Sequence, residues 1–189
     1  MHDITRSLSS ALCARDRGTR QHCDRVVELS QELGIHLELS QRELDMLKLG
    51  AQCHDIGKIG IPDRILHKAA PFDQDERAAM QAHPAIGQQI VLSIADEQAV
   101  ELGRIVRHHH ENFDGSGYPD QLAGEDIPLA ARIIALVDNY DAMAVSRPYH
   151  GGRSHRDIIS ILDSESRKFD PDLLHAFRHV IERSPMRAG

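Results

Sequence analysis

The sequence predicts an all-α protein built as a single bundle of short helices. Apolar residues recur at three- and four-residue steps along most of the chain, which is the period of an amphipathic helix. No segment shows the strand–helix alternation that a parallel sheet requires, and there is no internal repeat. The core suits close helix packing, since 41% of the residues are hydrophobic but only four Phe, three Tyr and no Trp occur.

Length, charge and cysteine count limit the class of protein. The 189 residues are enough for one hydrophobic core without disulfides. A formal net charge of −7 argues against general binding to nucleic-acid phosphates, and no apolar run approaches the roughly 20 residues of a membrane span. We expect a reduced, cytoplasmic protein without a nucleic-acid or membrane partner. Its cysteines form no CxxC pair, and Cys23 and Cys53 are expected to be small buried side chains rather than ligands.

The first two helices are expected over residues 4–17 and 19–34. In the second helix, His22 shares an apolar stripe with Val26 and Leu29. A histidine on such a face is most often a core residue with a hydrogen-bond partner, and position 22 alone favours that interpretation. The helix is expected to end at its glycine, because glycine commonly terminates helices.

The next helix leads into the sequence AQCHDIGKIGIP, residues 51–62. Ser40 opens this helix, and a glutamate three residues later completes a capping box. His54 continues the buried face, while Asp55 is turned about a quarter of a circle away. The imidazole and the carboxylate can therefore approach one ion, or two neighbouring ions, from different angles. The glycines that follow let the backbone turn sharply, and Lys58 between them would bring a cation close to whatever a metal binds.

Further histidines occur where helices begin and end. An Asp73 capping box opens a short helix, and the pair His83-Pro84 follows, with proline favouring the first helical position. A helix from about residue 96 ends in a run of three histidines. The apolar stripe of that helix places His109 and His110 on the buried side and turns His108 toward solvent.

A long turn-rich loop, ENFDGSGYPDQLAGEDIP, spans residues 111–128. Loops of this length in compact domains are usually functional or mobile. Tyr118 stands between a glycine and a proline, beside the histidine pair, which suits contact with a ligand. The helix expected over residues 127–146 is the most apolar, so Asp138 and Asp141 inside it must be paired, protonated or metal-bound. Two further helices are expected, over residues 157–163 and 170–182.

Taken together, the motifs HDIGKIGIP, HP, HHE, DGSGYP, DNYDAM and RPY resemble, in this order, the HD-GYP family of the HD metal-dependent phosphohydrolases. The resemblance runs from about residue 14 to about residue 171 of what we expect to be one domain, residues 1–189. It implies a single HD-domain-type helical bundle with a long GYP loop. Members of this family hydrolyse the bacterial second messenger cyclic di-GMP, using two or three metal ions.

The resemblance also implies roles for particular residues. The implied metal ligands are His22, His54, Asp55, His83, His109, His110 and Asp138. Asp55 would bridge two metals and act in catalysis, and Lys58 would contact the scissile phosphate. Tyr118 and Arg147 match positions that lie near or bind the substrate. His150 stands where relatives often carry Lys or Arg as a further phosphate contact.

Two positions depart from the family pattern. Some relatives carry a Glu four residues before the first ligand histidine, where it is associated with a third metal. Here that position is Gly18, so a centre of two metal ions is expected. His150 replaces a permanent cation with a side chain that is charged only part of the time near neutral pH. The replacement of Lys or Arg by His150 is therefore expected to affect the affinity for the substrate, or even which substrate is bound.

Imidazole and carboxylate ligands without thiolates favour iron or manganese, with zinc as the alternative. Two such ions roughly 3.5–4 Å apart can share a hydroxide that attacks phosphorus in line. The expected reaction is hydrolysis of cyclic di-GMP to pGpG, with GMP as a further product to be tested. Two alternatives stay open: a degenerate module that binds nucleotides or proteins without turnover, and another type of HD nucleotide phosphohydrolase, which the DGSGYP loop disfavours.

The resemblance implies partners as well as chemistry. The substrate would be a cyclic dinucleotide, and the GYP loop would contact diguanylate cyclase (GGDEF-type) domains. Family members usually follow a sensor or receiver domain, and this sequence shows none. The regulatory input is therefore expected in trans, or from a domain that was removed from this chain.

Overall fold

The computed structural model describes residues 2–15, 19–145 and 152–189. All regular secondary structure in these ranges is helical, which confirms the predicted all-α class. The α-helices are α1 (His2–Arg15), α2 (Thr19–His36), α3 (Gln41–Cys53), α4 (Asp63–Leu66), α5 (Gln74–Met80), α6 (His83–Leu92), α7 (Ala99–His108), α8 (Leu129–Ala144), α9 (His155–Ser164) and α10 (Pro171–Ile181). Short 3₁₀-helices lie between them: η1 (Ile56–Gly60), η2 (Gly124–Asp126) and η3 (Ser166–Lys168).

Capping side chains open several helices where the sequence predicts them. Ser40 accepts a hydrogen bond from the backbone N–H of Glu43, whose side chain accepts the Ser40 N–H at 2.8 Å. The same reciprocal box opens α5 at Asp73. Ser154 and Asp170 cap α9 and α10 in turn. Local sequence therefore sets where these helices begin.

Some expected boundaries are wrong, most clearly at Gly34. Helix α2 does not end there but continues to His36, and the chain turns at Glu38, whose φ is +58°. A Cβ on Gly34 would lie 2.8 Å from Leu44 Cδ2, so this glycine lets α2 and α3 approach closely. Helix α7 begins at Ala99 rather than near residue 96, and α8 is shorter than expected at both ends.

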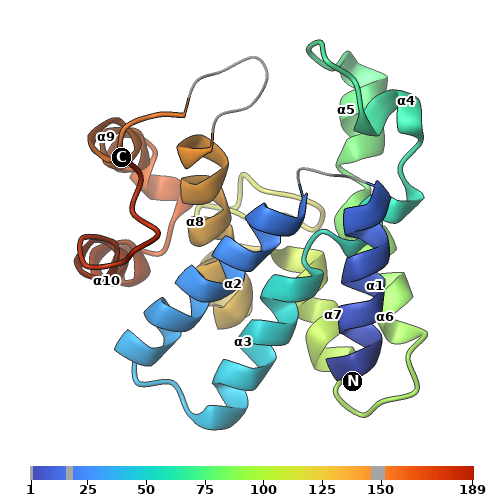
Figure 1. Ribbon diagram of the computed structural model, residues 1–189, viewed down its shortest axis with the longest axis horizontal. Coiled ribbons are helices and arrows are strands. Elements are labelled where there is room, and N and C mark those ends of the chain that lie inside the picture. The colour runs from blue at the N-terminus through green and yellow to red at the C-terminus, as the bar shows by residue number, and fades with distance from the viewer. Residues whose placement is uncertain (1, 16–18, 146–151) are drawn as a thin grey trace.

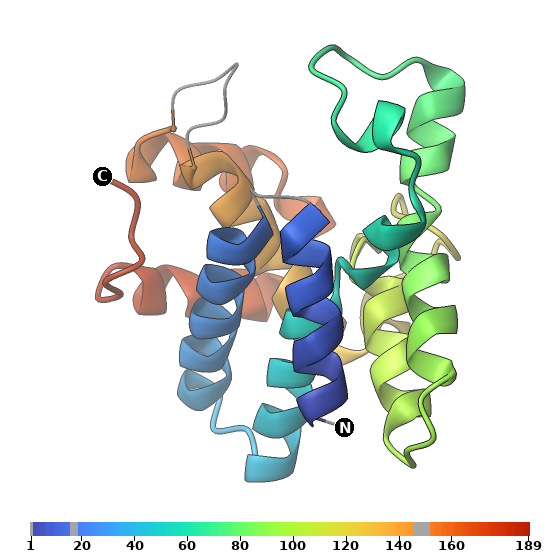
Figure 2. The same ribbon diagram turned by 45° about the vertical axis from the view of Figure 1, so that its right-hand side comes forward.

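Helices α2, α3 and α8 form the middle of the molecule (Figure 1). Helices α6 and α7 run side by side at one flank, and α9 and α10 lie at the other. Helix α1 packs against α3 and against η1, while α4 and α5 project beyond the end of α6 (Figure 2). Fully buried side chains from the central helices and their neighbours fill the core, among them Leu29, Leu47, Leu102, Ile134 and Phe177.

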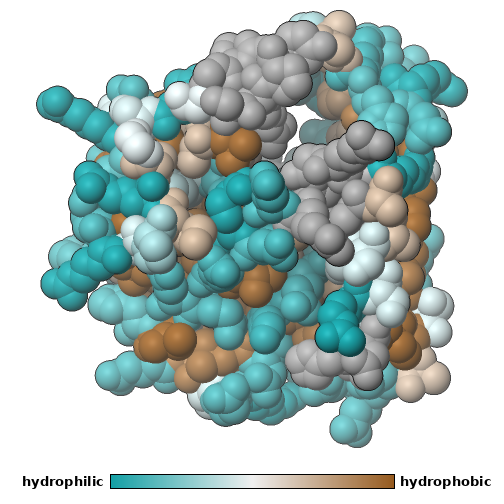
Figure 3. Space-filling view, viewed as in Figure 1, coloured by the Kyte–Doolittle hydropathy of each residue, from teal (hydrophilic) through white to brown (hydrophobic). Residues whose placement is uncertain are grey.

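The outer surface is mainly hydrophilic on the face shown in Figure 3, with hydrophobic residues in small groups. Single exposed apolar side chains are normal for a globular protein. None of the described helices combines the length and the apolar character that crossing a bilayer requires.

Two leucines test where the core lies. Leu47 in α3 has no exposed surface, whereas Leu92 at the end of α6 is 47% exposed. Leu47→Ala should lower the free energy of unfolding by about 2–5 kcal/mol, because truncation leaves a cavity. Leu92→Ala should change it by roughly 0.5 kcal/mol or less. Urea denaturation followed by circular dichroism measures both, and equal losses would contradict this assignment of the core.

Candidate metal centre

Seven histidine and aspartate side chains converge at one end of the helical core. They form two groups, and within each group the candidate ligand atoms all lie within 4.8 Å of one another. The first group contains Asp55, His83, His109 and His110, and the second contains His22, His54 and Asp138. Among the described residues, these two groups consist of the seven side chains that the sequence analysis named as ligands.

Helix ends supply most of these side chains. His54 directly follows α3, and Asp55 directly precedes η1. His83 is the first residue of α6, and His109 directly follows α7. Backbone groups at helix ends have no partner inside the helix, so polar side chains are readily accommodated there.

The backbone orients three of the imidazoles. Each Nδ1–H donates to the carbonyl three residues earlier: His54 to Ala51 (2.8 Å), His83 to Met80 (2.8 Å) and His109 to Val106 (2.7 Å). Because Nδ1 carries the proton, Nε2 presents a lone pair in the neutral ring. His54 Nε2 is buried without a hydrogen-bond partner among the described residues. A buried unpaired acceptor of this kind fits a metal ligand.

Asp55 lies between the two groups. Its Oδ1 is 3.4 Å from His83 Nε2, and its Oδ2 is 3.6 Å from His54 Nε2. Lys58 Nζ lies 2.6 Å from Oδ2. Burial would raise the pKa of Asp55, but the Lys58 ammonium and the His54 ring outweigh it and hold that pKa well below its usual value. The carboxylate is thus ionised and offers one oxygen to each group.

Asp141, which was expected to be paired, protonated or metal-bound but was not among the expected ligands, is paired and supports the second group. His22 Nε2 is 3.1 Å from Asp138 Oδ1, and His22 Nδ1 is 2.7 Å from Asp141 Oδ2. Arg25 holds the Asp141 carboxylate with two hydrogen bonds, of 2.6 and 3.0 Å. A carboxylate that fixes the far nitrogen of a ligand histidine is a common second support in metal sites. The three-residue spacings of Asp138 and Asp141, and of His22 and Arg25, are the signals that could have identified it.

Protonation differs between the two groups. Burial lowers the pKa of His110 to about 4 and also lowers the pKa values of His83 and His109. These rings are neutral at pH 7 and ready to bind a cation. Burial would lower the pKa of His22 too, but hydrogen bonds to Asp138 and Asp141 outweigh it and raise that pKa to about 9. Metal binding through His22 must therefore release a proton at pH 7.

Two glycines allow the backbone segments around the centre to touch. A Cβ on Gly57 would lie 1.8 Å from the His83 carbonyl oxygen. A Cβ on Gly117 would lie 2.6 Å from the His110 carbonyl oxygen. Neither glycine has a positive φ, and Gly57 permits η1 to pack against the start of α6. No other residue fits either position without a shift of the backbone.

Tyr118 covers one edge of the centre. Its ring stacks on His110 at a centroid distance of 4.9 Å and an interplanar angle of 26°. Its backbone N–H donates to the His110 carbonyl at 3.2 Å, and its peptide bond to Pro119 is cis. Burial raises the pKa of the Tyr118 hydroxyl, and the charges of Asp55 and Asp138 add to the effect. Tyr118 thus stays a protonated hydrogen-bond donor beside the ligands.

The expectation that His108 faces solvent is wrong. His108 points away from the ligand groups but is buried, with its Nε2 2.9 Å from Asp120 Oδ2. Arg107 binds the same carboxylate at 2.6 and 2.7 Å, and Glu111 accepts the Asp120 backbone N–H at 2.7 Å. The 111–128 loop therefore folds back over α7 and covers the face that helical periodicity assigns to solvent.

The remaining residues singled out from the sequence lie outside the described ranges or outside the two ligand groups. Gly18, Arg147 and His150 lie outside the described residues. Cys23 and Cys53 are buried, as predicted, and belong to neither ligand group. Burial raises the pKa of the Cys53 thiol to about 12, so it is unreactive at neutral pH.

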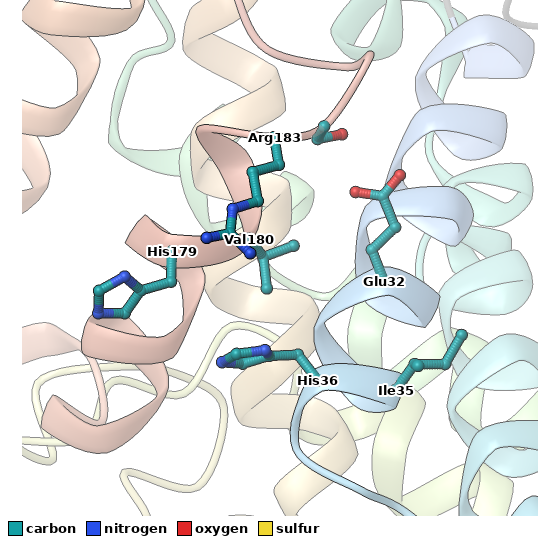
Figure 4. Close-up of a pocket in the computed structure, with 7 residues that line it drawn as sticks. Glu32, Ile35, His36, His179, Val180 and Arg183 are labelled. Atoms are coloured by element: carbon teal, nitrogen blue, oxygen red, sulfur yellow. The ribbon is translucent and has the colours of Figure 1, made fainter.

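A separate cavity of about 510 Å³ lies between α2 and α10. Its lining residues are Glu32, Ile35, His36, His179, Val180, Arg183 and Ser184. Figure 4 shows His36 on α2 and His179 on α10, the two helices that border the cavity. None of the seven clustered side chains lines this cavity, so its size alone does not make it the reactive site.

The donor set fits divalent transition metals. Imidazole nitrogens and carboxylate oxygens without sulfur suit iron, manganese or zinc. Four of the seven ligands are buried and three are half-buried, the backbone fixes three of the rings, and one lone pair has no other partner among the described atoms. These properties match a metal centre better than a solvated acidic surface.

Neighbouring histidines give a matched test of this arrangement. His109→Ala removes a ligand from the first group and should lower the metal-to-protein ratio, because three donors remain where there were four. His108→Ala removes only the contact to Asp120 and should leave that ratio unchanged. Elemental analysis of anaerobically purified protein measures both. Loss of metal in His108→Ala, or full retention in His109→Ala, would contradict the two groups described above.

Comparison with known proteins agrees with this geometry. A family model described as an HD domain matches residues 6–173. The chain is 37% identical over 171 residues to the cyclic di-GMP phosphodiesterase response regulator RpfG of Xanthomonas campestris pv. campestris, covering 89% of this chain and 45% of that protein. It is 36% identical over 174 residues to the 3′3′-cGAMP-specific phosphodiesterase 2 of Vibrio cholerae serotype O1, covering 91% and 33%.

The fold is shared with a solved structure. Bd1817, an HDG"Y"P protein from Bdellovibrio bacteriovorus, superposes with a TM-score of 0.68 at 20% identity, covering 85% of this chain and 51% of that one. This chain spans less than half the length of the two curated relatives above. The family match extends over nearly all of the described helices and includes every clustered ligand. The chain therefore belongs to the HD-domain family, and its HDIGK and DGSGYP motifs place it in the HD-GYP group of that family.

Proposed function

We propose that this chain is a single HD-GYP domain that acts as a metal-dependent cyclic dinucleotide phosphodiesterase. The expected reaction is hydrolysis of cyclic di-GMP to pGpG, with GMP as a further product. The observation that carries the proposal is the pair of adjacent ligand groups with Asp55 between them. The names of the relatives support the substrate class, since they are called phosphodiesterases for cyclic di-GMP and for 3′3′-cGAMP.

The centre is proposed to hold two divalent ions, iron or manganese, with zinc as the alternative. Bound there, such ions would supply Lewis acidity toward the phosphate and a nucleophile at neutral pH. Asp55 would bridge them, since each of its oxygens faces one group. The neutral rings of His83, His109 and His110 bind cations without first losing a proton.

The chain's own residues would position the substrate. Lys58 Nζ lies beside the Asp55 carboxylate, where its charge can stabilise a phosphate whose negative charge increases during cleavage. Tyr118 offers a protonated hydroxyl at the rim of the same centre. The family resemblance adds Arg147 and His150 as phosphate contacts. It also suggests that the GYP loop docks GGDEF-type diguanylate cyclase domains.

A substrate panel tests the proposal. Metal-loaded protein is incubated with cyclic di-GMP, the cyclic GMP–AMP hybrid and linear pGpG, and the products are separated by chromatography. Hydrolysis of a cyclic dinucleotide that chelation abolishes and metal restores is the expected result. Binding of the nucleotide without turnover would instead indicate a degenerate regulatory module. Turnover of linear nucleotides alone would indicate another HD phosphohydrolase.

Tyr118 separates substrate handling from metal retention. Tyr118→Ala removes the ring that stacks on His110, and should lower kcat/KM while leaving the metal-to-protein ratio unchanged. Tyr118→Phe is the matched control, since it keeps the stacked ring and removes only the hydroxyl. If the ring matters most, Phe restores most of kcat/KM; if the hydroxyl does, Phe resembles Ala. Loss of metal in Tyr118→Ala would contradict the separation.

A further inference from the structure

The last residue of α1 reaches the segment that follows the HD dipeptide. Arg15 Nη1 donates to the carbonyl of Lys58 at 3.3 Å and to the carbonyl of Ile59. Its Nη2 donates to the carbonyl of Ile61 at 2.5 Å and to Asp63 Oδ1 at 2.7 Å, and its Nε donates to the same Asp63 oxygen at 3.1 Å. One guanidinium therefore binds four residues of a segment that lies more than 40 residues away in sequence.

The segment needs such a partner because η1 is short. Carbonyl groups at the end of a helix receive no hydrogen bond from inside the helix. An arginine near that end can donate to them. Within the segment, the Lys58 backbone N–H donates to the Asp55 carbonyl at 2.9 Å, and the Ile61 backbone N–H donates to the Lys58 carbonyl at 3.1 Å. The planar, five-donor guanidinium suits several acceptors at once better than a lysine ammonium does.

The same segment carries both groups expected to act in the reaction. Asp55 directly precedes η1, and Lys58 lies within it. On its other side, η1 is packed against the start of α6, where Gly57 leaves no space for a side chain. This packing holds Asp55 and His83 in place. A shift of the end of η1 would therefore move Lys58 relative to both.

We propose that Arg15 is a positioning residue that fixes Lys58 and the end of η1 from α1, so that the placement of α1 controls where Lys58 lies relative to the centre. An exposed ion pair alone would have little effect, and Asp63 is 74% exposed. The carbonyl contacts, not the pair with Asp63, carry the inference. The effect of Arg15 on turnover rests on the proposed phosphodiesterase activity. The effect of Arg15 on the order of the segment does not.

The first experiment measures the segment directly. Amide hydrogen exchange, read by mass spectrometry, is compared between wild type, Arg15→Gln and Arg64→Gln. Arg64 is an exposed arginine of the adjacent α4. Its variant removes the same charge near the segment and therefore serves as the matched control. Arg15→Gln should speed exchange in peptides covering residues 56–66 at least severalfold and leave α8 and α10 unchanged. Exchange that is unchanged in Arg15→Gln, or equally fast in Arg64→Gln, would overturn the proposal.

The second experiment asks whether Arg15 acts through Lys58. Arg15→Gln should lower kcat roughly ten- to a hundredfold at an unchanged metal-to-protein ratio, since small misplacements of reacting groups have effects of this size. In a Lys58→Ala background the same change should have no further effect on kcat. Arg15→Lys should recover part of the loss. Additive losses in both backgrounds would overturn the positioning role. A wild-type protein that hydrolyses no cyclic dinucleotide would overturn the proposed function, while the exchange experiment would still decide whether Arg15 holds the segment.

Discussion

The constraint on which the structure depends is the burial of histidines and aspartates at the end of an apolar helical core. Uncompensated burial of such groups is costly, so every polar atom that does not face the centre needs a partner. Backbone carbonyls take the Nδ1 protons of three imidazoles, Lys58 pairs with Asp55, and Arg25 pairs with Asp141. The atoms that remain are Nε2 lone pairs and carboxylate oxygens directed at one another. Cations bound by the two groups would satisfy these atoms.

Local sequence predicts the parts of this arrangement that lie on helices. Helical period places His22, His54 and His109 on inward faces, and cap signals at Ser40 and Asp73 set where helices begin. Ligands at helix ends are predictable because the position of the end determines the direction of the side chain. The fold class and the set of clustered residues therefore follow from the sequence and from its resemblance to a known family.

The features that sequence reasoning missed depend on contacts between segments that are distant in the chain. His108 is buried because the 111–128 loop returns over α7, and no periodicity within α7 reports that. Gly34 lies inside α2 because side chains of α3 pack against it. Asp141 was expected to need a partner, but that its partners are His22 and Arg25 follows only from α2 and α8 lying side by side. In each case a partner chosen by tertiary structure overrides a local preference.

Holding the metal ligands and contacting the substrate are thus assigned to different kinds of segment. Helix ends hold most of the ligands, and the three rings that donate to backbone carbonyls have little freedom. The residues expected to meet the substrate lie instead on η1 and on the GYP loop, two segments that neighbours hold in place: Arg15 and the start of α6 for η1, and Arg107, Glu111 and His110 for the loop. Relatives named for two different cyclic dinucleotides are almost equally similar to this chain. Under the proposed function, the choice of nucleobase is therefore best sought in these supported segments, which lie beside the ligands.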